Sequence, residues 1–592
     1  MNQPSPAIVA QNAVQRLPRW ALLLLCLAYV VPGFVGRAPW RSTDMAAFGI
    51  MRELALGHTD WMAPLLAGRP PDTEGLLPYW LGAWSMQAFD SLLGIELAAR
   101  LPFAALLALT LAATWYGAYY LARSPLAQPV AFAFGGEARP VDYARTLADA
   151  ALLALVACLG LAQPSHETTS HLVQLACTSF LFAAAAAMPW RLMWPMAAAA
   201  AGLAGLVLSG APALAMLLGL GSAVLVWFSS AGATLPRRAQ ASGWLLAVVA
   251  ACALLAQALD LWGWRIIGWQ DAKSWQSLAR LFTWYLWPVW PLALWTVWRW
   301  RRQIASRQWH RHLLLPLWFA GVAIGATLTT WPADRALLLS LPAMATLAAF
   351  ALPTLRRGIA SLIDWFTLLF FSISAIAIWV VWLAVQTGFP AKPAANVARL
   401  APGYVNHFAL LPLLVALAAT VAWCALVRWR AVRQRTVLWK SLVLPAGGTT
   451  LAWLLMMTLW LPLLDYGRSF VPQIAAVRQA MAQAALPTPA TPPQGGGAAM
   501  AATGDCVIGY GLSLAQTAAL VYHGNMRMAT PLDAGTCQWV IADGDAHPRV
   551  TQALPAPQWE LVASVPRPTA RDDLLLVLRR ARALDPQDAH TR

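Results

Sequence analysis

The chain has 592 residues, of which 59% are hydrophobic and only 11% are charged. Soluble domains carry about 25% charged residues, so this composition excludes a set of soluble domains and indicates a polytopic membrane protein. The net charge of +16 does not indicate a nucleic-acid partner, because the basic residues stand in short clusters between apolar runs. Such clusters orient membrane proteins with their basic loops in the cytoplasm.

The first 19 residues are polar and basic, and the apolar run behind them has no small-residue cleavage site leading into a soluble chain. We therefore expect a cytoplasmic N-terminus (1–19) followed by a retained first helix. Apolar runs of about 20 residues, the length that crosses a bilayer, recur up to residue 464. The thirteen candidate spans lie near 20–37, 97–121, 146–163, 172–188, 193–208, 211–230, 242–262, 281–299, 313–330, 335–353, 360–387, 408–427 and 438–464. This pattern predicts an all-α polytopic domain over residues 20–470.

The basic clusters between the spans fix the expected topology. Threading the spans from a cytoplasmic N-terminus puts four clusters on the cytoplasmic side: 235–240, 299–312, 355–358 and 428–435. The segments expected on the outer face are the first outer loop 38–96, the turn 162–171, the loop 263–280 and everything after about 465. We expect a multi-pass protein of the bacterial inner membrane, with these outer segments in the periplasm.

An aspartate, Asp44, follows the first span in the predicted outer helix 42–58. The apolar residues of this helix recur at helical spacing, so we expect it to lie in the membrane interface with its apolar face in lipid. Asp44 stands near the start of the helix, where an acid can cap it and complement its dipole. Taken alone, the residue is therefore interpreted more simply as a cap than as a functional group.

The outer turn "SHETTSHL" (165–172) is a second polar constellation. His166, Glu167 and His171 are candidate ligands of a divalent metal ion, or Glu167 is a candidate second carboxylate beside Asp44. The two histidines are five positions apart, which differs from the zinc-protease pattern HExxH. The alternative is a polar cap on the following span, which is favoured for His171.

The segment 262–300 is rich in tryptophan, one part of the 33 tryptophans in the chain. Trp and Tyr gather at membrane interfaces as anchors, so we expect most of these side chains to be anchors. Three of them lie in the outer loop itself and are candidates for a lid or for sugar stacking: Trp264, Trp269 and Trp275.

The C-terminal region has a different composition. Residues 484–503 are rich in Pro, Gly, Ala and Thr without apolar periodicity, which is typical of a flexible linker. Residues 504–592 predict a small periplasmic α/β domain with the strands "DCVIGY", "CQWVIADG", "QWELVASV" and "LLLVLRR" and the helix "SLAQTAALVYHG". Its cysteines, Cys506 and Cys537, are expected to form a disulfide in an oxidising compartment, the alternative being two unpaired buried thiols.

The first outer loop resembles that of membrane glycosyltransferases of the protein O-mannosyltransferase and lipid A aminoarabinose transferase type (family 39-like). Asp44 matches the family's acid, and three further elements follow in the family's order: "DWMAPLLAG" (60–68), "PYWLGAW" (78–84) and "ARLP" (99–102). Weaker likeness continues through 209–218 and 334–350. The chain departs from the pattern at Met45, where the family has a second acid, and at Glu74 or Gly75, where it has a basic residue.

The resemblance implies a C-type glycosyltransferase fold and transfer of a sugar from a polyprenyl-phosphate donor to lipid A, another glycolipid or a protein, with inversion, at the periplasmic face. Asp44 is then the expected general base, with Glu167 the second carboxylate. Basic side chains or a metal must stabilise the leaving phosphate. The candidates are Arg41, Arg52, Arg69, Arg265, Lys273 and Arg335. For each of these taken singly, anchoring to anionic headgroups or simple solvation is the favoured interpretation, but as a group we expect at least one to contact phosphate.

Two other classes of protein remain as alternatives. One is a catalytically inactive relative that binds lipid-linked glycans as a membrane scaffold. The other is a transporter, which is disfavoured because the predicted spans carry almost no ionisable residues.

Overall fold

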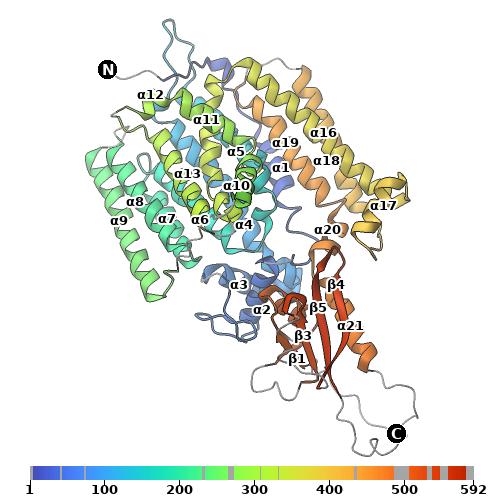
Figure 1. Ribbon diagram of the computed structural model, residues 1–592. Coiled ribbons are helices and arrows are strands. Elements are labelled where there is room, and N and C mark those ends of the chain that lie inside the picture. Colours follow the sequence, from blue (N-terminus) through green and yellow to red (C-terminus); the bar gives the residue numbers. More distant parts are fainter. Residues whose placement is uncertain are drawn as a thin grey trace, which may run out of the picture.

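The computed structural model describes residues 5–581 except 41–42, 73–74, 230–233, 264–271, 307, 331–332, 433–436, 486–505, 530–536 and 547–557. A large helical bundle forms one end of the molecule, and a small domain built on a β-sheet forms the other (Figure 1). The described residues therefore fold as an α-helical bundle with an α/β appendage, as the sequence predicts.

The bundle is built from apolar helices joined by short connections. Its first part contains α1 (Arg19–Val30), α4 (Ile95–Ala122), α5 (Pro140–Ala157), α6 (Ser170–Ala187), α7 (Met193–Leu208), α8 (Pro212–Phe228) and α9 (Leu235–Ala258). Its second part contains α10 (Ala272–Tyr285), α11 (Val289–Arg299), α12 (Arg301–Ile304), α13 (Arg311–Thr329), α14 (Ala333–Leu338), α15 (Leu341–Ala351), α16 (Arg357–Thr387), α17 (Ala391–Leu400), α18 (Leu410–Val432), α19 (Lys440–Met456) and α20 (Leu461–Arg468). Short 3₁₀ turns of this region include η3 (Leu159–Leu161), η4 (Pro164–His166) and η5 (Leu352–Thr354).

Each of the thirteen predicted spans overlaps one of these helices or a consecutive pair. Among the described residues, six single helices are long and apolar enough to cross a membrane, and two bent pairs raise the number to eight. The pairs are α5 with η3 and η4, bent by 63°, and α19 with α20, bent by 69°. Both bends lie beside segments that contribute to the polar site described below, so the breaks in these two runs bring Asp465 and Thr168 into that site. The number thirteen itself stays a prediction.

Helices α2 (Thr43–Ala55) and α3 (Leu77–Leu93) lie between the bundle and the small domain (Figure 1). The expectation that α2 turns an apolar face to lipid is wrong, because Met45, Phe48 and Met51 are fully buried in protein. α3 covers α2 on one side, where Gly82 leaves room for the Met51 side chain: a Cβ on Gly82 would lie 2.3 Å from the Met51 sulfur. α2 is therefore an internal helix of the structure.

The C-terminal domain contains a five-stranded mixed sheet in the order β2-β1-β3-β5-β4. Its elements are α21 (Val471–Ala485), β1 (Cys506–Tyr510), α22 (Leu514–Tyr522), β2 (Arg527–Met528), β3 (Trp539–Asp543), η6 (Gly544–Ala546), β4 (Trp559–Arg567) and β5 (Ala570–Arg580). The four predicted strands and the predicted helix all appear, and Ser513 caps α22 by accepting a hydrogen bond from the backbone of Gln516. Cys506 and Cys537 are joined by a disulfide, with their Cα atoms 5.1 Å apart.

The C-terminal domain docks on α2 through α22. A Cβ placed on Gly49 of α2 would come within 2.6 Å of the Ala518 Cβ, so the two helices touch at a position where only glycine fits. The Arg69 guanidinium donates a hydrogen bond to the carbonyl of Leu512, 2.5 Å away. The Tyr522 hydroxyl lies 3.2 Å from the Glu96 carboxylate of α4. The domain therefore rests on the helix that carries Asp44.

We expect Gly49→Leu to separate α22 from α2, because the larger side chain has no space at this contact. Overpacking of this kind costs about 1 to 3 kcal/mol, and the C-terminal domain should become more susceptible to limited proteolysis. Gly321→Leu is the matched control, since nothing lies within 4 Å of a Cβ built at Gly321. Equal proteolysis of the two variants would contradict the docking.

Candidate active site

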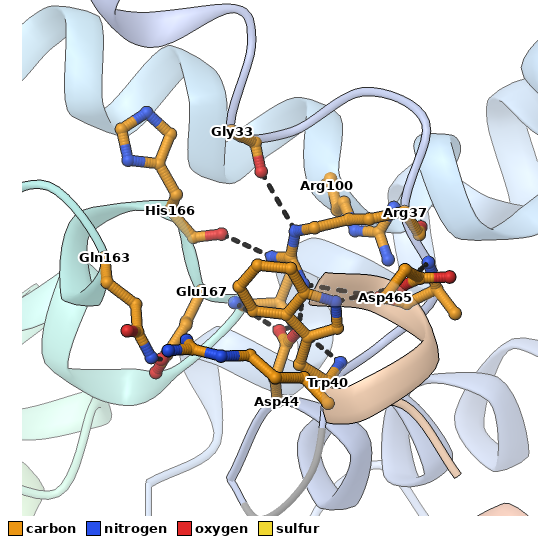
Figure 2. A network of polar contacts seen from close by, with 12 residues as sticks. Gly33, Arg37, Trp40, Asp44, Arg100, Gln163, His166, Glu167 and Asp465 are labelled. Atoms are coloured by element: carbon orange, nitrogen blue, oxygen red, sulfur yellow. Dashed lines mark hydrogen bonds and ion pairs between the residues drawn. The ribbon is translucent and has the colours of Figure 1, made fainter. Parts of the chain in front are cut away.

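The Asp44 carboxylate, in the first turn of α2, is 1% exposed and accepts hydrogen bonds on both oxygens. Oδ2 accepts from the Arg37 guanidinium at 2.7 Å and from the Trp40 backbone N–H at 3.0 Å. Oδ1 accepts from the backbone N–H of Thr168 at 2.8 Å and from its hydroxyl at 2.7 Å. Asp44 thus joins the end of the first span, the start of α2 and the outer turn after η4 (Figure 2).

All four donors lie outside α2, so the contacts of Asp44 differ from those of a helix cap. Burial alone would raise the pKa of Asp44, but Arg37, Arg100 and the two hydrogen bonds from Thr168 together lower it below its ordinary value. The carboxylate is therefore ionised at neutral pH, and its affinity for a proton is low.

Two buried arginines, which sequence reasoning did not single out, complete this centre. Arg37 also donates to the carbonyls of Gly33 at 3.0 Å and His166 at 2.6 Å, and Arg100 donates to the carbonyl of Arg37 at 2.6 Å. Arg100 belongs to the "ARLP" element, which was a signal for it in the sequence. Arg37 follows the first apolar run, where a basic residue is ordinarily interpreted as an interfacial anchor.

Trp40 connects this centre to α20. Two guanidinium groups lie over its ring, with Arg37 4.7 Å and Arg468 5.0 Å from the ring centroid. Its indole N–H donates to the Asp465 carboxylate at 2.9 Å, and the same oxygen accepts from the Ala38 backbone at 3.0 Å (Figure 2). The bent helix pair of α19 and α20 is thereby attached to the segment that carries Asp44.

Glu167 precedes the residue that bonds Asp44, and it is also buried. Its carboxylate forms an ion pair with Arg335 of α14 at 2.5 Å and accepts a hydrogen bond from Gln163 at 3.4 Å. Burial raises the pKa of Glu167, and Arg335 offsets that effect only in part, so the net shift is upward. Two of the residues proposed from sequence, Glu167 and Arg335, are therefore in contact beside Asp44.

The proposed metal ligands do not come together. The His166 ring nitrogens lie 2.5 Å from the carbonyl of Ala162 and 3.1 Å from that of Tyr29, and Figure 2 shows the ring pointing away from Glu167. Within the described part of the chain, no three His, Cys, Asp or Glu side chains are placed to hold a metal ion. The divalent-metal hypothesis for His166, Glu167 and His171 is thus wrong for the described structure, because the His166 ring is held by the carbonyl of Ala162, which follows η3, and by that of Tyr29 near the end of α1.

The other candidates proposed from sequence lie away from the carboxylates or outside the described residues. Arg52 pairs with Glu53 at 3.2 Å, and Arg69 bonds the C-terminal domain, so both serve local structure. Lys273 and Trp275 are exposed on α10. Arg41, Arg265, Trp264 and Trp269 fall outside the described residues.

A cavity of about 900 Å³ opens beside this site. Most of its lining is apolar and comes from the end of α1 and from α18 and α20, with Val31, Val35 and Leu411 among the lining residues. Asp465 and Tyr466 also line it, and Asp465 is the carboxylate that bonds Trp40. An apolar chamber therefore ends at the polar network that contains Asp44.

We expect Asp44→Asn to be the most destabilising single change in this network, because it leaves the buried Arg37 guanidinium without the carboxylate that it contacts. Breaking a buried pair in this way costs about 3 to 5 kcal/mol. The double variant Arg37→Gln/Asp44→Asn should unfold at a higher temperature than Asp44→Asn alone, since it removes one unpaired charge. Thermal unfolding at neutral pH is the measurement, because a lowered pKa keeps the contribution of Asp44 present there and loses it only in acid. A double variant less stable than Asp44→Asn would contradict this account of the ion pair.

Comparison with known proteins finds no family model and no curated protein that matches the sequence. Two solved structures are similar, both of ArnT from Cupriavidus metallidurans, one bound to undecaprenyl phosphate and one in the apo state. The TM-scores are 0.53 and 0.54, with 15% and 14% sequence identity respectively. Each alignment covers 95% of this chain and 98% of the ArnT chain. ArnT is a lipid A aminoarabinose transferase, and this chain has the C-type glycosyltransferase fold of that protein.

Proposed function

We propose that the chain is a membrane glycosyltransferase that transfers a sugar from a polyprenyl-phosphate donor to lipid A, another glycolipid or a protein. The observation that carries this proposal is the junction of the Asp44 network with the apolar cavity. A lipid-linked sugar needs an apolar chamber for its prenyl chain and a charged site for its phosphate and reacting carbon. The cavity and the network supply both, with Asp465 at their boundary.

The two carboxylates are suited to different tasks. Asp44 is ionised and held by four hydrogen bonds, so it is a weak base that can orient an acceptor through a fixed negative charge. Glu167 has a raised pKa, which makes its ionised form the better proton acceptor of the two. We assign acceptor orientation to Asp44 and proton removal to Glu167, which takes the place of the second acid that Met45 replaces.

Arginine side chains supply the charge that the leaving phosphate needs. Six basic residues were proposed from the sequence as phosphate contacts. Among those that the structure describes, Arg335 is the one that contacts a carboxylate of the site. With Arg37 and Arg100 it places three guanidinium groups around Asp44 and Glu167, and we assign the contact with the phosphate group to these cations. As the acceptor attacks the sugar carbon, negative charge grows on the departing polyprenyl phosphate, and these guanidinium groups stabilise it.

The proposed topology places this chemistry at the periplasmic face. Helix α2, whose first turn carries Asp44, and the C-terminal domain lie toward the same end of the molecule, and α12, which belongs to a basic cluster, lies at the other (Figure 1). Basic clusters favour the cytoplasm, so we assign the N-terminus to the cytoplasm and the C-terminal domain to the periplasm of a bacterial inner membrane. The polyprenyl donor would then be used at the outer leaflet.

Mass spectrometry of glycolipids and lipid A tests the proposal in cells that lack the gene. We expect a sugar-sized mass to be absent and to return with the wild-type chain. It should stay at least about 100-fold reduced with Glu167→Gln, since general acid–base groups contribute 10²–10⁴-fold, and it should also stay reduced with Asp44→Asn, which removes the charge that orients the acceptor. Asp149→Asn is the control: it is a buried carboxylate bonded to Leu17 and Trp115, away from the site.

Full restoration by both Asp44→Asn and Glu167→Gln would contradict the catalytic assignment. It would favour the alternative of an inactive relative that binds lipid-linked glycans as a scaffold, provided the deletion still alters the envelope.

The pH dependence of transfer separates the two carboxylates. Because the pKa of Glu167 is raised, the wild-type rate should fall as the pH drops through a value above the ordinary glutamate pKa of about 4.3. The Glu167→Gln variant should be slow at every pH, and its rate should not show this fall at low pH. A steady-state assay of both chains over pH 4 to 8 measures the difference. If the rate of Glu167→Gln falls at low pH as the wild-type rate does, the proton transfer belongs to another group.

A further inference from the structure

A buried basic cluster lies at the start of α13, at the end of the bundle away from the Asp44 site. It consists of Arg311, with its neighbours His310 and His312, and it follows the short helix α12 that marks this end in Figure 1. Arg311 is 2% exposed and His312 is 0% exposed. The proposed transfer reaction uses none of these side chains.

Five side-chain nitrogens of this cluster are buried and lack a hydrogen-bond partner in the described structure. The Nε and Nη1 atoms of Arg311, both ring nitrogens of His312 and Nδ1 of His310 are buried and make no hydrogen bond. A buried charge without a partner is strongly unfavourable. Five unsatisfied polar atoms in three consecutive residues therefore indicate a group that the chain itself does not supply.

The surroundings of the cluster are positive. Arg238, at the start of α9, lies near enough to Arg311 to repel it, and the N-terminal end of α13 adds the positive pole of a 19-residue helix. The sequence has no Asp or Glu between residues 168 and 259, between 272 and 333, or between 336 and 363. These ranges contain α8, α9, α11, α12, α13 and α15, so none of these six helices carries an acidic side chain that could pair with Arg311.

Aromatic packing holds the cluster in place. The His312 ring lies 5.4 Å from the Trp300 ring and 5.5 Å from the Phe350 ring, measured between centroids. Trp309 stacks on Phe228 at the end of α8, with centroids 4.9 Å apart. Aromatic side chains from α8, from the end of α11 and from α15 therefore hold the unpaired nitrogens in fixed positions. Donors fixed in this way can bind a ligand without rearrangement.

We propose that this cluster is a binding site for a phosphate group, with Arg311 as the cation and His312 as a hydrogen-bond donor. Oxygens of a phosphate accept several hydrogen bonds at once, and helix N-termini favour such anions. The phosphate belongs either to free inorganic phosphate or to a phospholipid headgroup, because α13 is apolar enough to span a membrane. The site is separate from the donor phosphate site assigned above.

Thermal unfolding of the purified full-length protein in a phosphate-free detergent tests the site. Inorganic phosphate, compared with chloride at equal ionic strength, tests the free anion. Vesicles of phosphatidylglycerol, compared with vesicles of a diacyl glycolipid that lacks phosphate, test the headgroup. We expect one of these phosphate sources to raise the Tm by roughly 2 °C or more.

The variants assign that response to the cluster. Arg311→Gln should abolish the Tm shift, whereas Arg302→Gln, an exposed arginine of the same segment, should keep it. His312→Phe retains the ring packing and should raise the phosphate concentration that gives the half-maximal shift several-fold, which keeps the test valid if Arg311→Gln does not fold. The proposal is overturned if neither phosphate source shifts the Tm, or if Arg311→Gln and His312→Phe both respond as the wild type does.

Discussion

The burial of the Asp44 carboxylate against Arg37 is the interaction on which the rest of this site depends. An ion pair taken out of water is tolerated only where further hydrogen bonds satisfy both partners. Thr168, Trp40, Gly33 and the His166 carbonyl supply those bonds, and they come from segments more than 120 residues apart in the chain. Satisfying one buried charge therefore fixes the outer turn, the end of the first span and the start of α2 in one arrangement.

The same constraint explains the position of the C-terminal domain. α2 is covered by α3 on one side and by α22 on another, so the helix that carries Asp44 is held by the bundle and by the appended domain. Arg69, Tyr522 and Gly49 make the contacts at this second face. The domain therefore contacts the helix that carries Asp44, although its own elements donate no hydrogen bond to the Asp44 carboxylate in the described structure.

The fold was largely predictable from the sequence, because apolar runs and basic clusters are local signals that survive without an alignment. The α/β character of the C-terminal domain was predictable for the same reason, since each strand and the Ser513 cap are encoded in a few neighbouring residues. Asp44 and Glu167 could also be singled out as acids beside apolar runs. Arg37 could not, because a basic residue at the end of a span has the same local pattern whether it anchors a headgroup or neutralises a buried carboxylate. Arg100 lies in the "ARLP" element, so the family resemblance was the signal that pointed to it. The lipid-facing orientation predicted for α2 failed because amphipathic spacing shows that a face is apolar, without showing whether lipid or protein covers it.

The central claim is that the Asp44 and Glu167 site uses a polyprenyl-phosphate-linked sugar. Free polyprenyl phosphate is released in such a transfer whatever the sugar and acceptor are. The most direct measurement is therefore its appearance, by mass spectrometry, when the purified protein is incubated with a total lipid extract that contains donor and acceptor. The account predicts a time-dependent rise with the wild-type chain and none above background with Asp44→Asn or Glu167→Gln. An equal rise with all three chains, or none with the wild type, would contradict it.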